Sequence, residues 1–212
     1  MQTFDRTSIK EEAKRILSQN RSICISMFLV IAVAEAVFAA VSLGFLSILL
    51  AGLTAVTSAF FYLACWRESP VTVSQSLSET FDNGFLRKIG GMLWMQLKVF
   101  LWSFVFIIPG IIKAYSYILT DYVLADCPQI PAMDACRISE KIMRGHRAEY
   151  FLMELSFVGW MLLSAFTFGI LFVVHVGPYI QLTRSGIYKE LKQIAIENGV
   201  VTQAELDGQI II

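Results

Sequence analysis

Six apolar runs follow one another along the chain, and each is about as long as a helix that crosses a bilayer, which needs about 20 mostly apolar residues. The runs are Ile23–Val41, Phe45–Cys65, Ile89–Ile108, Ile111–Ala125, Tyr150–Phe166 and Ile170–Tyr188. The fourth run is the shortest and carries Lys113 and Asp121, so whether it spans fully stays open. The pattern predicts an all-α membrane protein with six transmembrane segments.

Short turns without charged residues join the runs in pairs, which predicts three helical hairpins. The turns fall at 42–44, 109–110 and 167–169, and the Pro109-Gly110 pair is a strong signal for the end of a helix. All but two of the 17 Lys and Arg residues, Lys98 and Lys113, lie near the chain ends or between hairpins. Because cytoplasmic loops carry the basic excess, both termini are predicted to be cytoplasmic. The predicted hairpins cover about 23–65, 89–125 and 150–188, within one membrane domain at 1–192 that precedes a cytoplasmic tail at 193–212.

An amphipathic helical stretch precedes each predicted hairpin. The three stretches are Ser8–Asn20, Val73–Asp82 and Pro131–Gly145, and each ends in Asn or Gly signals for a helix stop. Their regular spacing favours one unit used three times, with each helix lying on the cytoplasmic side of the membrane. The alternative is coincidence among segments whose length the bilayer fixes. In the tail, Thr202 and Glu205 have the spacing of a capping box.

Composition and charge agree with a membrane protein and exclude several other classes. Hydrophobic residues make up 56% of the chain and charged residues only 16%, against about 25% in typical soluble domains. The net charge of zero gives no reason to expect nucleic acid as a partner. The four cysteines form no CxxC pair, so neither a metal nor another cofactor is predicted. Enzyme motifs such as GxSxG, HExxH or a Walker loop do not occur, which argues against an enzyme.

Several blocks of the sequence resemble the bacterial integral-membrane proteins grouped as domain-of-unknown-function family 975. The blocks are Phe106–Tyr117, Tyr122–Asp126, Met143–His146, Leu155–Trp160 and Gly177–Tyr179. Within them, the motif residues are Pro109, Gly110, Lys113, Tyr117, Asp126, Gly145, His146, Gly159, Trp160, Pro178 and Tyr179. The resemblance implies a multi-pass protein of the bacterial cytoplasmic membrane, and it implies no activity or substrate.

Ionisable groups inside a bilayer are functional candidates, because burying them without compensation is costly. Glu35 and Lys98 lie at similar depths in the first and third runs, so we predict that they form an internal ion pair. Such a pair can also simply hold two helices in register. Asp121 is expected to line a polar cavity, whereas Glu154 and Asp126 are expected to reach the cytoplasmic interface, where water solvates them.

Two further ionisable side chains lie in the apolar runs. Lys113 lies near the outer turn and is expected to extend outward to the membrane surface. His175 precedes Gly177-Pro178, where a broken helix would expose backbone carbonyls of the kind that form transporter sites. A packing kink is the simpler alternative.

Two functions are considered from the sequence, and the first is favoured, with the second as the alternative. The first is a non-enzymatic membrane protein whose basic helical stretches, Ser8–Arg21 and Pro131–Arg147, bind anionic lipid headgroups or a membrane or cytoplasmic partner protein. The second is a small transporter or channel-like protein with a polar path around Glu35, Lys98, Asp121 and His175. Convergence of Glu35, Lys98 and Asp121 on one cavity would favour the second function. A lipid-processing enzyme would need polar groups at headgroup depth, for which Glu154, Asp126 and His146 are the candidates.

Overall fold

The computed structural model describes residues 4–41, 45–68, 71–82, 84–105, 107–167 and 169–208. Side chains at 38–41, 45–50, 82, 102–105 and 107–109 lie outside this description. The described part is all-helical, as predicted. Its helices are α1 (Arg6–Gln19), α2 (Arg21–Val41), α3 (Phe45–Trp66), α4 (Val73–Asp82), α5 (Phe85–Val105), α6 (Ile107–Tyr117), α7 (Thr120–Asp126), α8 (Ala132–Ile142), α9 (Arg147–Leu155), α10 (Val158–Phe166), the π-helical turn η1 (Phe172–Val176), α11 (Gly177–Glu197) and α12 (Gln203–Leu206).

The apolar runs become helices close to their predicted limits, and α4 has the predicted bounds. Two runs differ from one continuous helix. The fourth run divides into α6 and α7, and Pro109 lies in the first turn of α6, where a proline is tolerated because its missing N–H is not needed. The fifth run divides into α9 and α10 around Ser156 and Phe157. The predicted turn at 42–44 lies outside the described residues.

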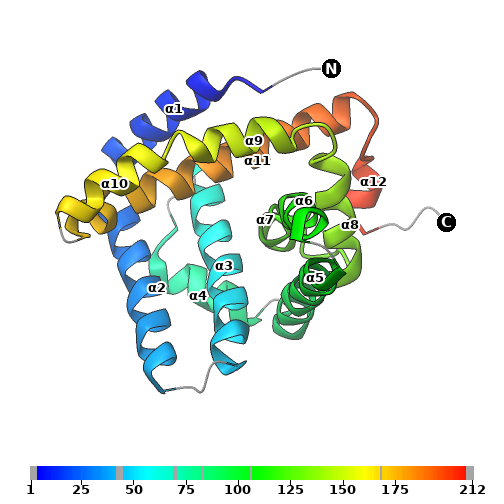
Figure 1. The fold of residues 1–212 in the computed structure, drawn as a ribbon, viewed down its shortest axis with the longest axis horizontal. Helices are drawn as coiled ribbons and strands as arrows, with labels where there is room; N and C mark the ends of the chain where they lie inside the picture. The colour runs from blue at the N-terminus through cyan, green and yellow to red at the C-terminus, as the bar shows by residue number, and fades with distance from the viewer. Residues whose placement is uncertain are drawn as a thin grey trace.

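The hairpins do not form one parallel bundle. Figure 1 shows α2 and α3 running away from a layer made by α1, α9, α10 and α11, while α5 and α6 lie to the other side of α3. Consistent with this layering, α1 and α2 meet at an angle of 95°. Among the described residues, only the stretch Arg147–Phe166 is long and apolar enough by itself to cross a membrane. The bent pair Arg6–Gln19 and Arg21–Val37 is long and apolar enough only when the two helices are counted as one span. Six parallel transmembrane segments are therefore not established by the structure.

Two of the three amphipathic stretches, those of α1 and α8, turn their apolar faces toward protein, whereas α4 buries Ser76 and Thr80 and leaves Phe81 55% exposed. The buried residues of α1, Ile9, Ala13, Ile16 and Leu17, belong to the face that packs against α11. Helix α8 packs between α5, α6 and α7 and buries Ala135, Cys136, Ile138, Ser139 and Ile142. In α1 and α8, packing against other helices therefore removes the apolar faces from solvent and leaves the opposite faces for contacts with lipid or a partner protein.

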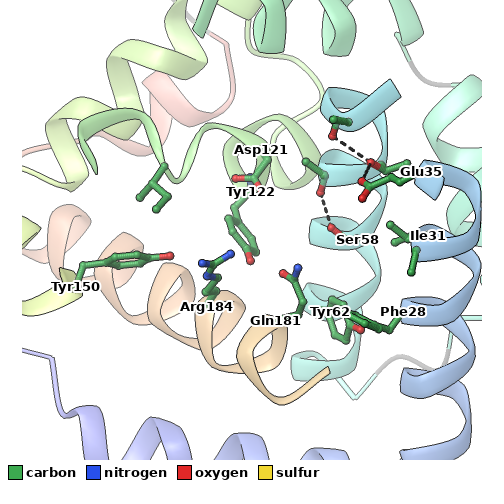
Figure 2. A pocket seen from close by; sticks show the side chains of 15 residues that line it. Phe28, Ile31, Glu35, Ser58, Tyr62, Asp121, Tyr122, Tyr150, Gln181 and Arg184 are labelled. Atoms are coloured by element: carbon green, nitrogen blue, oxygen red, sulfur yellow. Dashed lines mark hydrogen bonds between the residues drawn. The ribbon is translucent and has the colours of Figure 1, made fainter. Parts of the chain in front are cut away.

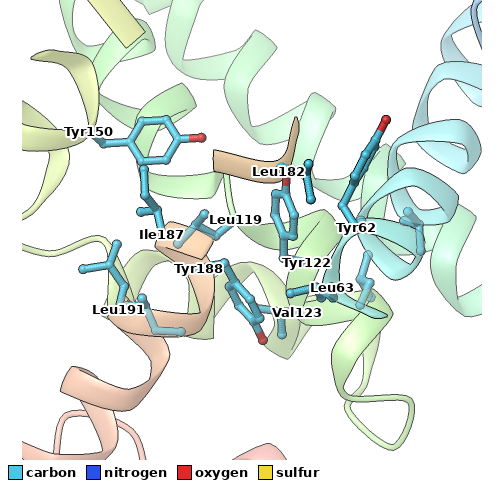
Figure 3. Packing of buried hydrophobic residues seen from close by; sticks show 14 of the residues in the cluster. Tyr62, Leu63, Leu119, Tyr122, Val123, Tyr150, Leu182, Ile187, Tyr188 and Leu191 are labelled. Atoms are coloured by element: carbon cyan, nitrogen blue, oxygen red, sulfur yellow. The ribbon is translucent and has the colours of Figure 1, made fainter. Parts of the chain in front are cut away.

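The core lies where α3, α7 and α11 meet (Figure 3). Tyr122 of α7 stacks on Tyr188 of α11 with ring centroids 5.5 Å apart. Close approach of helices also needs small residues here. A Cβ on Gly177 would lie 2.4 Å from the Phe28 ring of α2, and one on Gly186 would lie 2.3 Å from the Trp66 ring of α3. Both glycines thus let α11 approach the first hairpin closely.

Asp126 links the ends of all three hairpins. Its side chain is only 2% exposed, so the expected solvation of Asp126 at the interface is wrong, and it forms an ion pair with Arg67, which follows α3. Lys192 of α11 lies 2.5 Å from the other carboxylate oxygen, which also accepts a 3.0 Å hydrogen bond from the Tyr188 hydroxyl. A buried carboxylate requires such partners, since its desolvation is otherwise very costly. We call Asp126, Arg67, Tyr188 and Lys192 the hairpin junction.

The C-terminal tail folds back onto the helices. Thr202 caps α12, and its Oγ1 accepts from the Glu205 N–H at 3.2 Å while its own N–H donates to the Glu205 carboxylate at 3.1 Å. The predicted capping box is thus confirmed. Lys141 of α8 pairs with Glu205 at 2.5 Å, and Leu206 is buried. These contacts fix the tail to α8 over its described residues.

Candidate functional site

A polar cavity of about 260 Å³ lies between α2, α3, α7 and α11, and we call it cavity A (Figure 2). Its polar side chains come from four helices that are far apart in sequence. They are Glu35, Thr54, Ser58, Asp121, Gln181 and Arg184. Aromatic side chains from the same helices and from α9 complete the wall.

Glu35 lies on α2, and its side chain is exposed where it lines cavity A. Its carboxylate accepts a hydrogen bond of 2.7 Å from the Thr54 hydroxyl of α3. Because Thr54 itself is buried, this bond fixes the carboxylate against the hairpin partner helix. One acidic group is therefore positioned at the α2 side of the cavity.

Asp121 supplies the second acidic group from the start of α7. The break between α6 and α7 at Ile118 and Leu119 turns the chain so that Asp121 occupies the first turn of a new helix. One carboxylate oxygen accepts a 3.0 Å hydrogen bond from the Tyr122 N–H. An acidic side chain in the first helical turn is also favoured by the helix dipole. The prediction that Asp121 lines a polar cavity agrees with this geometry.

Arg184 of α11 is the basic group of the site. Its Nη2 lies 2.6 Å from the Glu154 carboxylate of α9, whose second oxygen accepts a 2.9 Å hydrogen bond from the Tyr115 hydroxyl. Glu154 is therefore half-buried in a polar network, and the expectation of a solvated interfacial side chain does not describe it. Glu154 of α9 thus holds the Arg184 guanidinium, while Arg184 of α11 and Tyr115 of α6 hold the Glu154 carboxylate.

Tyr150 is buried, and its hydroxyl has no hydrogen-bond partner among the described residues. Figure 2 shows the hydroxyl ends of Tyr150 and Tyr122 directed toward Arg184. A buried hydroxyl without a partner costs about 1–3 kcal/mol, so most native proteins avoid it. Such an atom beside a cavity is typical of a place where a bound molecule supplies the missing partner.

A second, larger cavity of about 790 Å³ adjoins the first, and we call it cavity B. It is mostly apolar and lies against α5 and α6, with Met92, Met95, Gln96 and Tyr115 in its wall. Four residues, Ala55, Ile118, Asp121 and Arg184, line both cavities. These four residues therefore form the partition between cavity A and cavity B.

Lys98 and His175 line neither cavity, so the convergence that would favour a transporter is met by Glu35 and Asp121 but not by Lys98. The Lys98 ammonium lies 5.4 Å from the Trp94 ring centre and 5.2 Å from that of Tyr117, and the predicted ion pair with Glu35 is not formed between these described residues. The prediction compared the depths of Glu35 and Lys98 along parallel helices, whereas the hairpins cross. His175 packs between Trp160 and Tyr179, with ring centres 6.2 and 6.1 Å away.

The chain near His175 is one continuous helix rather than two half-helices. Pro178 lies in the first turn of α11, and Val176 and Gly177 both have helical backbone angles, so η1 passes directly into α11. A half-helix ion site at Gly177-Pro178 is therefore not formed. A π-helical turn contains one more residue than an α-helical turn. Directly after it, Phe28 packs on Gly177. The simpler alternative of a packing feature applies here.

The remaining motif residues have structural surroundings. Lys113 pairs with Glu140 of α8 at 2.6 Å, and the buried Tyr117 donates to the same carboxylate at 3.3 Å. The expected outward extension of Lys113 is thus wrong, because α8 packs beside α6. These contacts outweigh the loss of solvation at Glu140, so the pKa of that carboxyl lies below its ordinary value. Gly110 is buried, whereas a Cβ at Gly159 would meet nothing within 4 Å.

The segment between α8 and α9 contains the last motif residues. Gly145 has a φ of +94°, a conformation that favours glycine, and it reverses the chain before α9. His146 is buried, with its Nδ1 3.3 Å from Glu149 and its ring 6.3 Å from that of Phe4. The candidate set for lipid processing, Glu154, Asp126 and His146, is divided among the cavity network, the hairpin junction and this turn.

Sequence reasoning missed Arg184, Gln181 and Tyr150 as site residues. Arg184 groups with the cytoplasmic basic residues by charge placement, although it lies inside the sixth apolar run. An arginine within such a run is itself a signal for a polar site. Gln181 and Tyr150 carry no comparable signal, since tyrosine and glutamine are common at the ends of apolar runs.

Comparison with known proteins identifies a family for part of the chain. Residues 105–195 match the family described as "Protein of unknown function (DUF975)". This match confirms the resemblance that the blocks from Phe106 to Tyr179 indicated. No curated protein and no solved structure matches the chain.

Proposed function

We propose that this chain is an integral membrane protein of the small transporter or channel type, in which cavities A and B hold and pass a small polar solute. One observation carries the proposal: Asp121 and Arg184 stand in the partition that both cavities share. Ionisable groups placed between two cavities can replace the hydration of a solute as it moves from one to the other.

The surface of the third hairpin supports insertion into a membrane. In the apolar window within Arg147–Phe166 only 22% of residues are buried, whereas the core helix of a soluble protein is mostly buried. Its exposed side chains include Phe151, Leu155, Leu162 and Phe166. No Asp, Glu, Lys or Arg occurs from 155 to 183. Soluble monomers rarely expose apolar patches of this extent, and lipid accounts for it.

The distribution of basic residues supports an orientation with both termini in the cytoplasm of a bacterial cell. It gives less support to the alternative that the basic helices act by docking. On α8, Arg137 lies 3.9 Å from Asp134, and Lys141 pairs with Glu205. The apolar faces of α1 and α8 are already covered by other helices. What remains for lipid or a partner protein is the exposed basic side chains, such as Lys14 and Arg15 of α1 and Arg137 of α8.

The geometry suggests how a solute passes. The solute first contacts Glu35 at the exposed side of cavity A. It then contacts Asp121 and Arg184 at the partition and enters cavity B. Arg184 is held by Glu154, so movement of α11 relative to α9 would open the partition. Small displacements of packed helices are sufficient for such gating.

Two experiments test the proposal. Alkaline carbonate washing of cell membranes is expected to leave the protein in the pellet, and release into the supernatant would contradict membrane insertion. Mass spectrometry of small molecules retained by the purified protein should then compare wild type with Ala55→Phe, which fills the partition.

The matched control is Ala165→Phe, which places the same side chain on the exposed surface of α10. A small polar molecule is expected with wild type and Ala165→Phe and is expected to be lost in Ala55→Phe. Identical profiles for all three proteins would contradict a solute site in these cavities.

A further inference from the structure

We infer that cavity A binds a small organic cation, with its ammonium group between the carboxylates of Glu35 and Asp121. This inference rests on the proposed solute-binding function and adds the chemical class of the solute. It follows from the charges, the aromatic wall and the size of the cavity.

The charges that line the two cavities do not balance. Three carboxylates, those of Glu35, Asp121 and Glu154, face one guanidinium, that of Arg184. The direct ion-pair contact of Arg184 is with Glu154, at 2.6 Å. Among the ion pairs of the described residues, neither Glu35 nor Asp121 takes part. A cation bound in cavity A would therefore supply the charge that this wall lacks.

The two carboxylates are presented for such a contact. The Thr54 hydroxyl holds Glu35 at the exposed side, and the Tyr122 N–H holds Asp121 at the partition. Each uses one oxygen for its protein hydrogen bond and keeps acceptor capacity on the other. A ligand that donates charged hydrogen bonds, as a primary ammonium does, fits this pair of acceptors.

The apolar part of the wall is aromatic. Phe28, Tyr62, Tyr122 and Tyr150 line cavity A, and the three tyrosines are at most 3% exposed. An ammonium group that contacts the face of such a ring gains an attraction that a neutral solute of the same shape does not. The partnerless hydroxyl of Tyr150 adds a group that can pair with a hydroxyl on the solute.

The size of cavity A limits the solute. Sites for drug-sized molecules run from about 300 to 1,000 Å³, and about 260 Å³ lies just below that range. An amino alcohol or a comparable amine fits the volume and offers both an ammonium and a hydroxyl group. We therefore choose choline and ethanolamine as probes.

Equilibrium binding of labelled choline to the purified full chain in detergent tests the inference. Unlabelled ethanolamine and the neutral carbon isostere of choline, 3,3-dimethylbutan-1-ol, are the competitors. The variants are Glu35→Gln and Asp121→Asn, with Glu12→Gln and Asp134→Asn as surface controls. Glu35 is exposed, so Glu35→Gln keeps the test available even where Asp121→Asn fails to fold.

The expected result is saturable choline binding that ethanolamine displaces and the neutral isostere does not. Affinity is expected to fall about tenfold or more in each cavity variant, since each removes a negative charge beside the bound cation, and to stay unchanged in the controls. Equal binding of the neutral isostere, or choline binding that is insensitive to both variants, would overturn the inference.

The failure of this inference is distinguishable from that of the proposed function. If neither cation binds while Ala55→Phe still removes a retained small molecule, the solute class is wrong and the solute cavity stands. If Ala55→Phe changes nothing in either assay, the proposed function falls and the inference falls with it.

Discussion

Replacing Asp126 with asparagine should destabilise the protein, because it removes the charge at the hairpin junction. The Asp126 carboxylate is 2% exposed and pairs with Arg67 and Lys192, and it accepts from the Tyr188 hydroxyl at 3.0 Å. The introduced side chain would keep one oxygen for the tyrosine, but its amide N–H₂ group would face the cations. The change therefore leaves buried positive charge without compensation.

The size of the effect follows from the burial of each partner. Removing one member of a buried ion pair costs about 3–5 kcal/mol. Arg67 is 54% exposed and can turn to solvent, whereas Lys192 is 23% exposed and loses its partner. We therefore expect the free energy of unfolding to fall by about 2–4 kcal/mol, below the full cost of a buried pair. The control Asp134→Asn removes an exposed carboxylate 3.9 Å from Arg137 and should cost under about 1 kcal/mol.

Reversible unfolding by SDS in mixed micelles, followed by tryptophan fluorescence, measures both variants. A double-mutant cycle with Lys192→Met then isolates the pair, and we expect a coupling energy above about 0.5 kcal/mol. Equal unfolding free energies for Asp126→Asn and Asp134→Asn would refute the argument. Strict additivity of Asp126→Asn and Lys192→Met would show that the junction does not act as a charge pair.

Two further predictions concern the tail and the second hairpin. The hydrogen bond from Lys141 lowers the pKa of Glu205, so its stabilising contribution is present above the unfolded pKa of about 4.3 and is lost as pH falls through the lower folded value. Melting temperatures from pH 3 to 7 should show a loss at low pH that Glu205→Gln reduces, and unchanged curves would contradict it. Gly91→Ala would place a Cβ 2.8 Å from Leu124 and should be about 1–3 kcal/mol less stable than Gly90→Ala, whose Cβ meets nothing within 4 Å. Matched denaturation curves of the two alanine variants check this, and equal stability would show that the helices adjust freely.

Local sequence signals predicted the helices well. The run Phe45–Cys65 gave α3, the stretch Val73–Asp82 gave α4, and the Thr202 capping box appeared as expected. Apolar run length, turn residues and caps act over a few neighbouring residues, so they can be recognised without knowing the fold. The family match at 105–195 covers the same segment in which the motif blocks were found.

The candidate site was only partly predictable. Glu35 and Asp121 were expected from their place in apolar runs, and both line cavity A. Arg184, which lines the same cavity, resembles the cytoplasmic basic residues when only charge placement is considered. Depth along parallel helices predicted a Glu35–Lys98 pair, but that estimate depends on how the hairpins cross, which a single sequence does not encode locally.

The amino-acid sequence alone was enough to place the beginnings and ends of most helices, because periodicity, turns and caps depend on near neighbours. Which faces those helices cover depends on the packing between them. Packing of α8 against α6 gave Lys113 a partner in Glu140, and packing of α1 against α11 covered the apolar face of the first amphipathic stretch. It also brought Asp121 and Arg184 to one partition, since contacts between distant segments form only where shape and charge fit across helices.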